Sequence, residues 1–278
     1  MSVIVFTVIL LLGSYFAGLL GSLTGLGGGF VIIPLLTLLL HVDIHYAIGA
    51  SLVSIIATSS GSAAAYVKEG ITNIRLGMFL EIATTAGAFT GAMLAIYVPT
   101  QFIAVLFGII LVSSAIMSLR KKAEHIVHQE TWLSKKLKLG GTYPVNGGIV
   151  GYGVSNIAGG FFMMIFAGII SGLLGIGSGA LKVVAMDGIM RIPFKVSTTT
   201  SNFMIGVTAA ASAVVYLHRG YIHPELAMPV VIGVLLGALS GSKILVNATS
   251  STWLRWIFAL VVTFLAAQMI YNGIAGKI

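Results

Sequence analysis

Residues 167–188 read AGIISGLLGIGSGALKVVAMDG. A similar stretch, AGLLGSLTGLGGGF, occupies residues 17–30. Ala17 aligns with Ala167 at an offset of 150 residues, and identical residues recur in this register without a gap to about residue 93. A match of this length at one fixed offset indicates a tandem duplication. The two halves of the chain are therefore expected to share one architecture.

The composition is that of a protein embedded in lipid. Hydrophobic residues make up 58% of the chain and charged residues only 8%, and the mean hydropathy is +1.07. Soluble domains carry about 25% charged residues. Long apolar runs approach the ~20 residues that a helix needs to cross a bilayer, and no alternating barrel strands are seen. The sequence predicts an all-α polytopic membrane protein, retained in the bilayer by many segments.

Each half divides into about five membrane segments. These fall near residues 3–22, 27–40, 45–67, 74–98 and 101–119, and again near 150–172, 177–190, 195–217, 224–246 and 253–272. We therefore expect a first transmembrane repeat over 1–119, a basic cytoplasmic loop over 120–145, and a second repeat over 146–278. The net charge of +8 is assigned to such basic loops and not to a nucleic-acid partner.

The distribution of cationic residues selects the topology. Segments 27–40 and 177–190 span only about 21 Å each, so they either cross or re-enter. When the cations of the central loop are left out, five crossings per half place six cations inside and only Arg219 and Lys277 outside, whereas four crossings place four on each side. The residues that five crossings place with the cytoplasmic loop are Lys68, Arg75, Arg191, Lys195, Lys243 and Arg255. The positive-inside rule therefore favours two inverted repeats with both termini outside.

The glycine-rich starts of the two short segments are candidate substrate-binding elements. Short, glycine-interrupted segments at matching positions of inverted repeats point to a transporter's binding site near the midplane. Three glycines at a spacing of two predict that the backbone unwinds in each segment. The free N–H groups at the start of each following helix suit an anion. The residues concerned are Gly27, Gly28, Gly29, Gly177, Ser178 and Gly179. The alternative is close helix packing through small residues.

Hydroxyl side chains recur on one face of the helix after each short segment. Ser51, Thr58, Ser62 and Tyr66 are repeated as Ser201, Thr208, Ser212 and Tyr216, next to the stretch STTTSN at 197–202. Hydroxyls and amides donate to an oxyanion without presenting a negative charge. The expected ligands are Ser51, Thr199, Thr200, Ser201 and Asn202. The alternative, hydroxyls bonded back to their own helix, is expected for Ser62 and Ser212.

Three ionisable residues lie inside apolar segments, where such residues are costly and usually functional. Lys182 has Ile32 as its counterpart in the first repeat and is expected to supply the charge of the anion site. Glu81 and Asp187 are candidates for carrying a coupling proton. The alternative is a structural salt bridge from Lys182 to Asp187 or Glu81.

Other chemistry finds no support in the sequence. With no cysteine, disulfides and iron–sulfur clusters are excluded. No phosphate loop, metalloprotease helix, dinucleotide fingerprint or nucleophile–base pair is present. His125 and His128 in the central loop are expected to be solvated. We expect no enzyme activity, no cofactor and no metal.

The two repeats resemble a known family. GLGGGFVIIPLLTLLLHVDIHYAIGASLVSIIATSS at 25–60, and the stretch from GIGSGALKVV to YLHRGYI at 175–222, are similar to the repeats of the TauE/SafE family of sulfite exporter-like transporters. The resemblance extends from about residue 5 to 272. Val184 departs from the family's frequent proline, which Pro34 supplies in the first repeat, and Asp187 replaces a frequent asparagine.

This resemblance implies a secondary transporter of small sulfur anions, such as sulfite, thiosulfate or sulfoacetate, in the plasma membrane of a bacterium or archaeon. Alternating access between the repeats would move the anion. The alternatives are a passive anion channel and a transporter of a small non-sulfur carboxylate. The expected partners are the anion and the lipid bilayer, with a homodimer as an open alternative and no nucleic acid.

Overall fold

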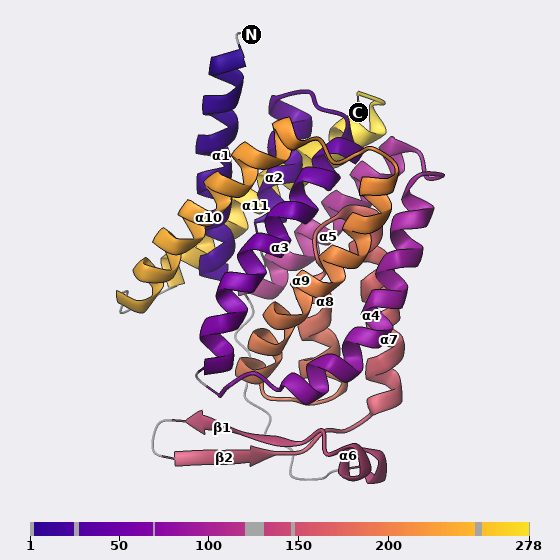
Figure 1. Ribbon diagram of the computed structural model, residues 1–278, viewed down its shortest axis with the longest axis vertical. Coiled ribbons are helices and arrows are strands. Elements are labelled where there is room, and N and C mark those ends of the chain that lie inside the picture. Colours follow the sequence, from indigo (N-terminus) through magenta and orange to yellow (C-terminus); the bar gives the residue numbers. More distant parts are fainter. Residues whose placement is uncertain are drawn as a thin grey trace.

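The computed structural model describes residues 3–24, 28–68, 70–119, 131–145, 148–247 and 252–277. Over these residues the chain is helical apart from one β-hairpin, as Figure 1 shows. Within the described residues six helices are long and apolar enough to cross a membrane, and further apolar helical stretches lie at Gly29–Leu39, Ile44–Ser60 and Ala259–Ile274. The prediction of an all-α polytopic membrane protein is confirmed at this level.

The elements follow the duplicated order. The first half contains α1 (Val3–Thr24), α2 (Gly29–Pro34), the π-helical turn η1 (Leu35–Leu39), α3 (Ile44–Lys68), α4 (Ile74–Ala95) and α5 (Thr100–Leu119). The second contains α7 (Ile157–Leu174), α8 (Gly179–Val183), η2 (Val184–Ile189), α9 (Phe194–His218), α10 (Pro224–Asn247) and α11 (Thr252–Ile274). Between them lie α6 (Trp132–Leu137) and the antiparallel strands β1 (Gly141–Val145) and β2 (Gly148–Tyr152).

The hairpin changes one predicted boundary. The sequence predicted a helix over residues 150–172, but residues 148–152 pair with β1 and α7 begins only at Ile157. Asn156 starts this helix by accepting a hydrogen bond from the Gly159 N–H, as N-cap residues do. The polar connection between the halves therefore extends beyond the predicted loop.

Both short segments contain a π-helical turn at the same place. Helix α2 passes into η1 after Pro34, and α8 passes into η2 at Val184. Proline has no N–H to donate, which accounts for a break in the first copy. Because the second copy forms the same turn with valine, proline is not required for it.

Two helix pairs pack through equivalent glycines. At Gly168 of α7, an added Cβ would strike the Thr84 carbonyl of α4, and at Gly18 of α1 it would strike the Val234 carbonyl of α10. Val234 is the counterpart of Thr84 in the repeat. Glycine therefore permits the same close backbone approach at both crossings.

The glycines on the partner helices α4 and α10 also make equivalent contacts, with α7 and α1. A Cβ on Gly87 would strike the Ile165 carbonyl, and one on Gly237 would strike the Tyr15 carbonyl, its counterpart. Helix α5 packs on α11 and α3 on α9, so each of these helices meets its own copy. Exchanging the two halves thus reproduces the main helix pairings.

The two halves begin at opposite ends of the bundle in Figure 1. Helix α1 starts at the top of the view, where α11 also ends, whereas α7 starts at the bottom beside the hairpin. Large apolar side chains cover the outside of the bundle, including Met78, Ile82, Phe162, Phe166 and Leu260. An apolar exterior of this extent suits contact with lipid tails.

Candidate functional site

The two glycine-rich segments meet around Ser51 of α3. Its Oγ donates a hydrogen bond to the Gly175 carbonyl of the second half over 3.0 Å. A Cβ on Gly29 would lie 2.6 Å from this Oγ and 3.4 Å from the same carbonyl oxygen. The structure therefore brings Gly29 and Ser51 of the first repeat against the break in the second.

The second repeat forms a similar contact with its own helix. Ser201 Oγ donates to the Gly179 carbonyl over 3.0 Å. A Cβ on Gly177 would lie 2.7 Å from Ile205 Cγ2 and 3.5 Å from Ile55 Cγ2, and these isoleucines are repeat counterparts. In this conformation the segment is closely packed, and both serine hydroxyls are bonded to backbone carbonyls.

The backbone before α8 is left-handed, as the glycine spacing predicted for an unwound stretch. Gly175, Gly177 and Ser178 have φ values of 65°, 71° and 49°. Non-glycine residues rarely adopt such values, so Ser178 occupies a strained position. Its side chain is fully buried, and its Oγ has no hydrogen-bond partner among the described residues.

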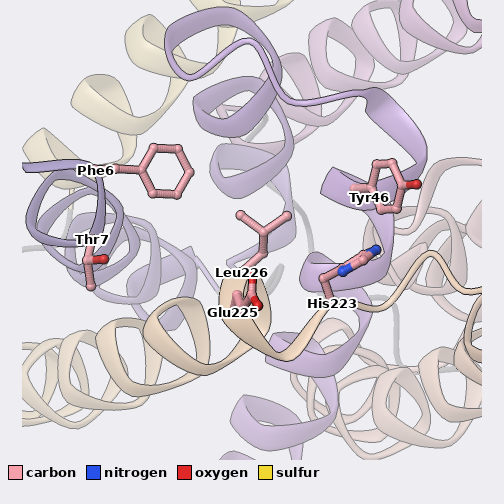
Figure 2. A pocket seen from close by; sticks show the side chains of 6 residues that line it. All are labelled: Phe6, Thr7, Tyr46, His223, Glu225 and Leu226. Atoms are coloured by element: carbon pink, nitrogen blue, oxygen red, sulfur yellow. The ribbon is translucent and has the colours of Figure 1, made fainter. Parts of the chain in front are cut away.

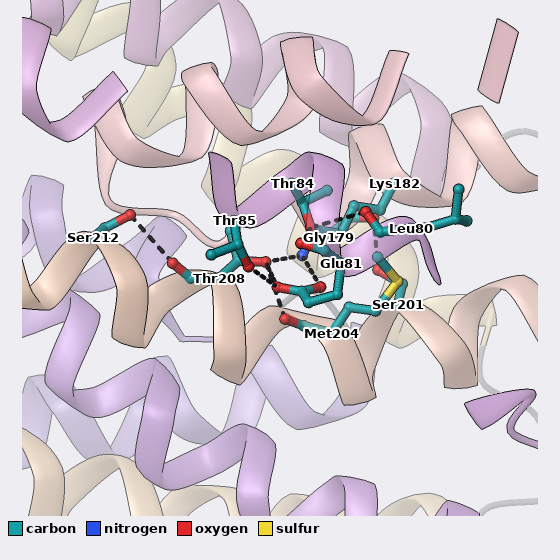
Figure 3. A network of polar contacts seen from close by, with 10 residues as sticks. All are labelled: Leu80, Glu81, Thr84, Thr85, Gly179, Lys182, Ser201, Met204, Thr208 and Ser212. Carbon is teal, nitrogen blue, oxygen red and sulfur yellow. Dashed lines mark hydrogen bonds and ion pairs between the residues drawn. The ribbon is translucent and has the colours of Figure 1, made fainter. Parts of the chain in front are cut away.

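Lys182 is fully buried and forms part of a polar network (Figure 3). Its Nζ donates a hydrogen bond to Thr208 Oγ1 and lies 3.8 Å from Glu81 Oε2. Of the two carboxylates that the sequence offered as partners, the structure therefore pairs Lys182 with Glu81. Asp187 lies five residues further along, half-buried in η2.

Glu81 is held by two threonine hydroxyls. Thr208 Oγ1 donates to Glu81 Oε1 over 2.6 Å, and Thr85 Oγ1 donates to the same oxygen over 3.2 Å. The other oxygen, Oε2, is buried and accepts no hydrogen bond from the described part of the chain. The helices that contribute Glu81 and Thr208, α4 and α9, are both candidate membrane spans.

A buried ion pair is stable only when both charged partners are present. Desolvating each ion costs several kcal/mol, and their mutual attraction offsets this cost only in good geometry. Here a hydroxyl group lies between the ammonium and one carboxylate oxygen, and the other oxygen lies beyond hydrogen-bonding distance. The pair is consequently less tightly compensated than a directly bonded ion pair.

The remaining predicted ligands have other contacts. Thr199 donates back to the carbonyls of Lys195 and Val196 in its own helix. Thr200 Oγ1 accepts the Asn73 N–H over 3.1 Å, and Asn202 is buried on the same helix. Gly28 lies at the start of α2, where its carbonyl accepts hydrogen bonds from Val31 and Ile32.

Two further predictions concern the neighbouring hydroxyls. Ser212 Oγ donates to the Thr208 carbonyl over 3.2 Å, so its predicted bond to its own helix is confirmed. Gly27 lies outside the described residues, and so does the side chain of Ser62.

Sequence reasoning missed Thr85 and Asn73. Thr85 is four residues after Glu81, a spacing that places both on one helical face and is readable from the sequence. Asn73 caps α4 by accepting the Leu76 N–H. Its Nδ2 also donates to the Leu139 carbonyl over 2.8 Å and to Tyr152 Oη over 2.9 Å. No sequence pattern links Asn73 to a hairpin that was itself unexpected.

The hairpin bounds a cavity of about 290 Å³ beside the start of α4. Arg75, Lys138 and Tyr152 line it together with the backbone of 140–142, and Arg75 donates to the Lys138 carbonyl over 3.3 Å. Burial raises the pKa of the Tyr152 phenol to about 12, so this hydroxyl remains protonated at physiological pH.

A larger cavity, about 580 Å³, opens at the end of the bundle where α1 begins (Figure 2). Its lining consists of Phe6, Thr7, Tyr46, His223, Glu225 and Leu226. The rings of Tyr46 and His223 meet edge to face at 4.9 Å. The lining includes no member of the Lys182 network, so this cavity is a separate feature.

Comparison with known proteins places these features in a family. A family model described as "Sulfite exporter TauE/SafE" matches residues 10–269. The chain is 32% identical over 278 residues to "Probable membrane transporter protein YunE" of Bacillus subtilis (strain 168), an alignment covering 97% of this chain and 98% of that protein.

More distant relatives carry similar names. "Probable membrane transporter protein YdhB" of the same strain is 27% identical, with 84% of this chain and 89% of that protein covered. A "Probable membrane transporter protein" of Xylella fastidiosa (strain 9a5c) is 25% identical, with 94% and 95% covered. No solved structure gives a significant match. The relatives are named as transporters and not as enzymes, and the chain itself belongs to the TauE/SafE sulfite exporter family.

Proposed function

We propose that this chain is a secondary transporter that moves a small anion, of the sulfur oxyanion or organosulfonate class, across the plasma membrane. The observation that carries the proposal is the fully buried Lys182, which lies between two membrane-spanning helices beside a break in the backbone. Ionisable residues at such depth usually mark the path of a substrate or ion. The family match and the names of the relatives support transport as the activity.

The anion would bind where the glycine-rich segments meet. Lys182 supplies the positive charge, and Ser178 supplies a buried hydroxyl that has no partner among the described residues. The side chains of four residues are proposed to reorient when the anion binds and to donate hydrogen bonds to it. These residues are Ser51, Ser201, Thr200 and Asn202. The free N–H groups around Gly28, Gly29, Gly177 and Gly179 add donors, and Gly27 and Thr199 complete the proposed lining.

Alternating access is proposed to arise from two inverted repeats. The opposite starting ends of α1 and α7 in Figure 1 support an inverted relation. The equivalent glycine crossings support a two-fold exchange of the halves. Rocking one repeat against the other around a fixed site is the motion that such repeats permit.

Counterflow distinguishes this transporter from an anion channel. Purified protein in liposomes preloaded with unlabelled thiosulfate should accelerate the entry of labelled thiosulfate, because a carrier returns loaded faster than empty. A channel shows no such stimulation. Replacing thiosulfate with sulfite, sulfoacetate or acetate then identifies the class. Counterflow with acetate but with none of the sulfur anions would contradict the sulfur-anion proposal.

The variant Lys182→Met tests the role of Lys182 in anion transport. We expect it to abolish anion counterflow, because the site loses its only buried cation among the described residues. The variant also leaves Glu81 unpaired, a change that costs about 3–5 kcal/mol in a buried pair. The double variant Lys182→Met with Glu81→Gln removes both charges and serves as the stability control. Wild-type counterflow in a folded double variant would overturn the role of Lys182.

A further inference from the structure

The Glu81–Lys182 contact in Figure 3 is mediated by a hydroxyl with a choice of two acceptors. Thr208 Oγ1 lies 2.6 Å from Glu81 Oε1 and 3.0 Å from the Met204 carbonyl of its own helix. A threonine hydroxyl has one proton to donate and two lone pairs that accept. Thr208 therefore has two hydrogen-bonding arrangements that need no movement of the backbone.

The charge on Glu81 determines which arrangement is stable. When Glu81 is ionised, the Thr208 proton points to Oε1, and the oxygen of Thr208 accepts from the Lys182 ammonium. When Glu81 is protonated, its own O–H donates to Thr208 Oγ1, and the threonine proton turns to the Met204 carbonyl. In this second state Lys182 has no counter-ion within the described network.

The net charge of the buried site links the proton to the anion. Ionised Glu81 and Lys182 sum to zero, whereas protonated Glu81 leaves a net charge of +1. An unpaired charge at this depth is costly, and a bound monoanion restores neutrality. Beside ionised Glu81, a monoanion would leave a net charge of −1 and a dianion a net charge of −2, so protonation of Glu81 reduces the uncompensated charge for either anion.

We propose, building on the proposed anion transport, that Glu81, Thr208 and Lys182 form a switch that admits one anion together with one proton. The proton enters from the water on the side to which the site is open, binds the Glu81 carboxylate, and leaves with the anion on the other side. The cycle is electroneutral for a monoanion and moves one net negative charge for a dianion.

Few other titratable groups lie near Glu81 in the described part of the chain. Among the described residues its carboxylate contacts Thr85, Thr208 and Lys182. Helix α7, which packs on α4, has no titratable residue. Those of α9 lie toward its ends, at Lys195, Tyr216 and His218. Arg75 lies near the start of α4, and Asp187 lies in η2 beyond Lys182.

Thiosulfate uptake into liposomes measures the coupling. Thiosulfate remains a dianion near neutral pH, so its own titration does not interfere. With the membrane potential clamped at zero and the outside acidic, one-to-one coupling accumulates thiosulfate about tenfold per pH unit, because each pH unit is worth a factor of ten. A dye inside the liposomes should record one proton entering with each thiosulfate.

The variant Glu81→Gln fixes the neutral form of the switch. We expect it to keep thiosulfate counterflow but to lose both the accumulation and the proton entry. Thr208→Val should slow uptake driven by the pH gradient, and Thr208→Ser, which retains the hydroxyl, should restore it. Thr90→Val is the matched control, because the Thr90 hydroxyl donates to carbonyls of its own helix.

Each result decides between the two proposals. Net thiosulfate uptake by the wild type without proton entry, or accumulation by Glu81→Gln equal to that of the wild type, overturns the switch and leaves anion transport standing. Absence of counterflow with thiosulfate, sulfite and sulfoacetate overturns anion transport and the switch with it. If Glu81→Gln does not fold, the proton-to-thiosulfate ratio of the wild type decides alone.

Discussion

At the scale of single residues, comparing each position with its counterpart 150 residues away shows which functional side chains are shared by the two repeats and which are not. Lys182 and Glu81 have Ile32 and Val231 as counterparts, whereas Thr208 has Thr58. Each charge therefore occurs in only one of the two copies, while the hydroxyls of Ser201 and Thr208 recur at Ser51 and Thr58. The ion pair is therefore a contact between α4 and α8 whose two residues have no ionisable counterpart in the other copy.

Two buried serines are expected to respond differently to the loss of their hydroxyls. Ser51→Ala removes a hydrogen bond to the Gly175 carbonyl and should cost about 1 kcal/mol of stability. Ser178→Ala removes an oxygen without a partner in the described structure, so it should change stability little and weaken anion binding. Thermal unfolding with and without thiosulfate measures both effects. A larger loss of stability in Ser178→Ala than in Ser51→Ala would refute this assignment.

The residue pattern anticipated the positions of the buried charges and offered two carboxylates as partners of Lys182, but it did not choose between them. An ionisable residue in an apolar run is visible in the sequence, whereas its partner lies on another helix, and no local periodicity encodes that contact. Asp187 is closer than Glu81 along the chain, yet Lys182 of α8 contacts Glu81 of α4. Tertiary packing therefore selects the partner.

At the scale of elements, the glycine crossings are expected to be sensitive to any added side-chain volume. Gly87→Ala and Gly237→Ala each place a methyl group against a backbone carbonyl of the facing helix. Both should lower the unfolding temperature and to a similar extent, because overpacking that moves the backbone costs about 1–3 kcal/mol. Gly188→Ala is the control, since its added Cβ would meet only Val184 Cγ1 at 3.8 Å. A harmless Gly237→Ala beside a damaging Gly87→Ala would argue against equivalent crossings.

The hairpin is expected to depend on Asn73. Asn73→Ala removes the cap of α4, worth about 0.5–2 kcal/mol, and both hydrogen bonds to the hairpin region. Hydrogen exchange in β1 and β2 should accelerate. Asn73→Asp retains the capping oxygen but lacks the two donors, so it should loosen the hairpin while preserving the start of α4. Equal protection of the hairpin in all three proteins would contradict this role.

The long helices were predictable because apolar runs of membrane length have few alternative structures. The hairpin was not, because β1 (GTYPV) falls in a stretch that reads as a polar loop, whereas β2 (GIVGY) is apolar and reads as the start of the next membrane helix. The predicted start of α7 was therefore too early. Glycine spacing predicted the unwound segment before α8, since positive φ angles at Gly175 and Gly177 favour that residue.

At the scale of the whole molecule, the arrangement of helices makes a prediction about sidedness. The start of α1 and the end of α11 lie opposite the hairpin in Figure 1. The cationic residues near the hairpin end, including Arg75 and Lys138, favour the cytoplasmic side for it. The chain contains no cysteine, so single introduced cysteines report position without background.

Lys277→Cys and Trp132→Cys should label from opposite sides of the membrane. Lys277 follows α11 and Trp132 begins α6, and Trp132 is 72% exposed. In intact cells an impermeant maleimide should modify the cysteine at 277 and leave that at 132 unmodified until the membrane is permeabilised. Labelling of both from outside would exclude this sidedness. Labelling of the cysteine at 132 alone would reverse the orientation and still agree with inverted repeats, because the two ends would remain on opposite sides.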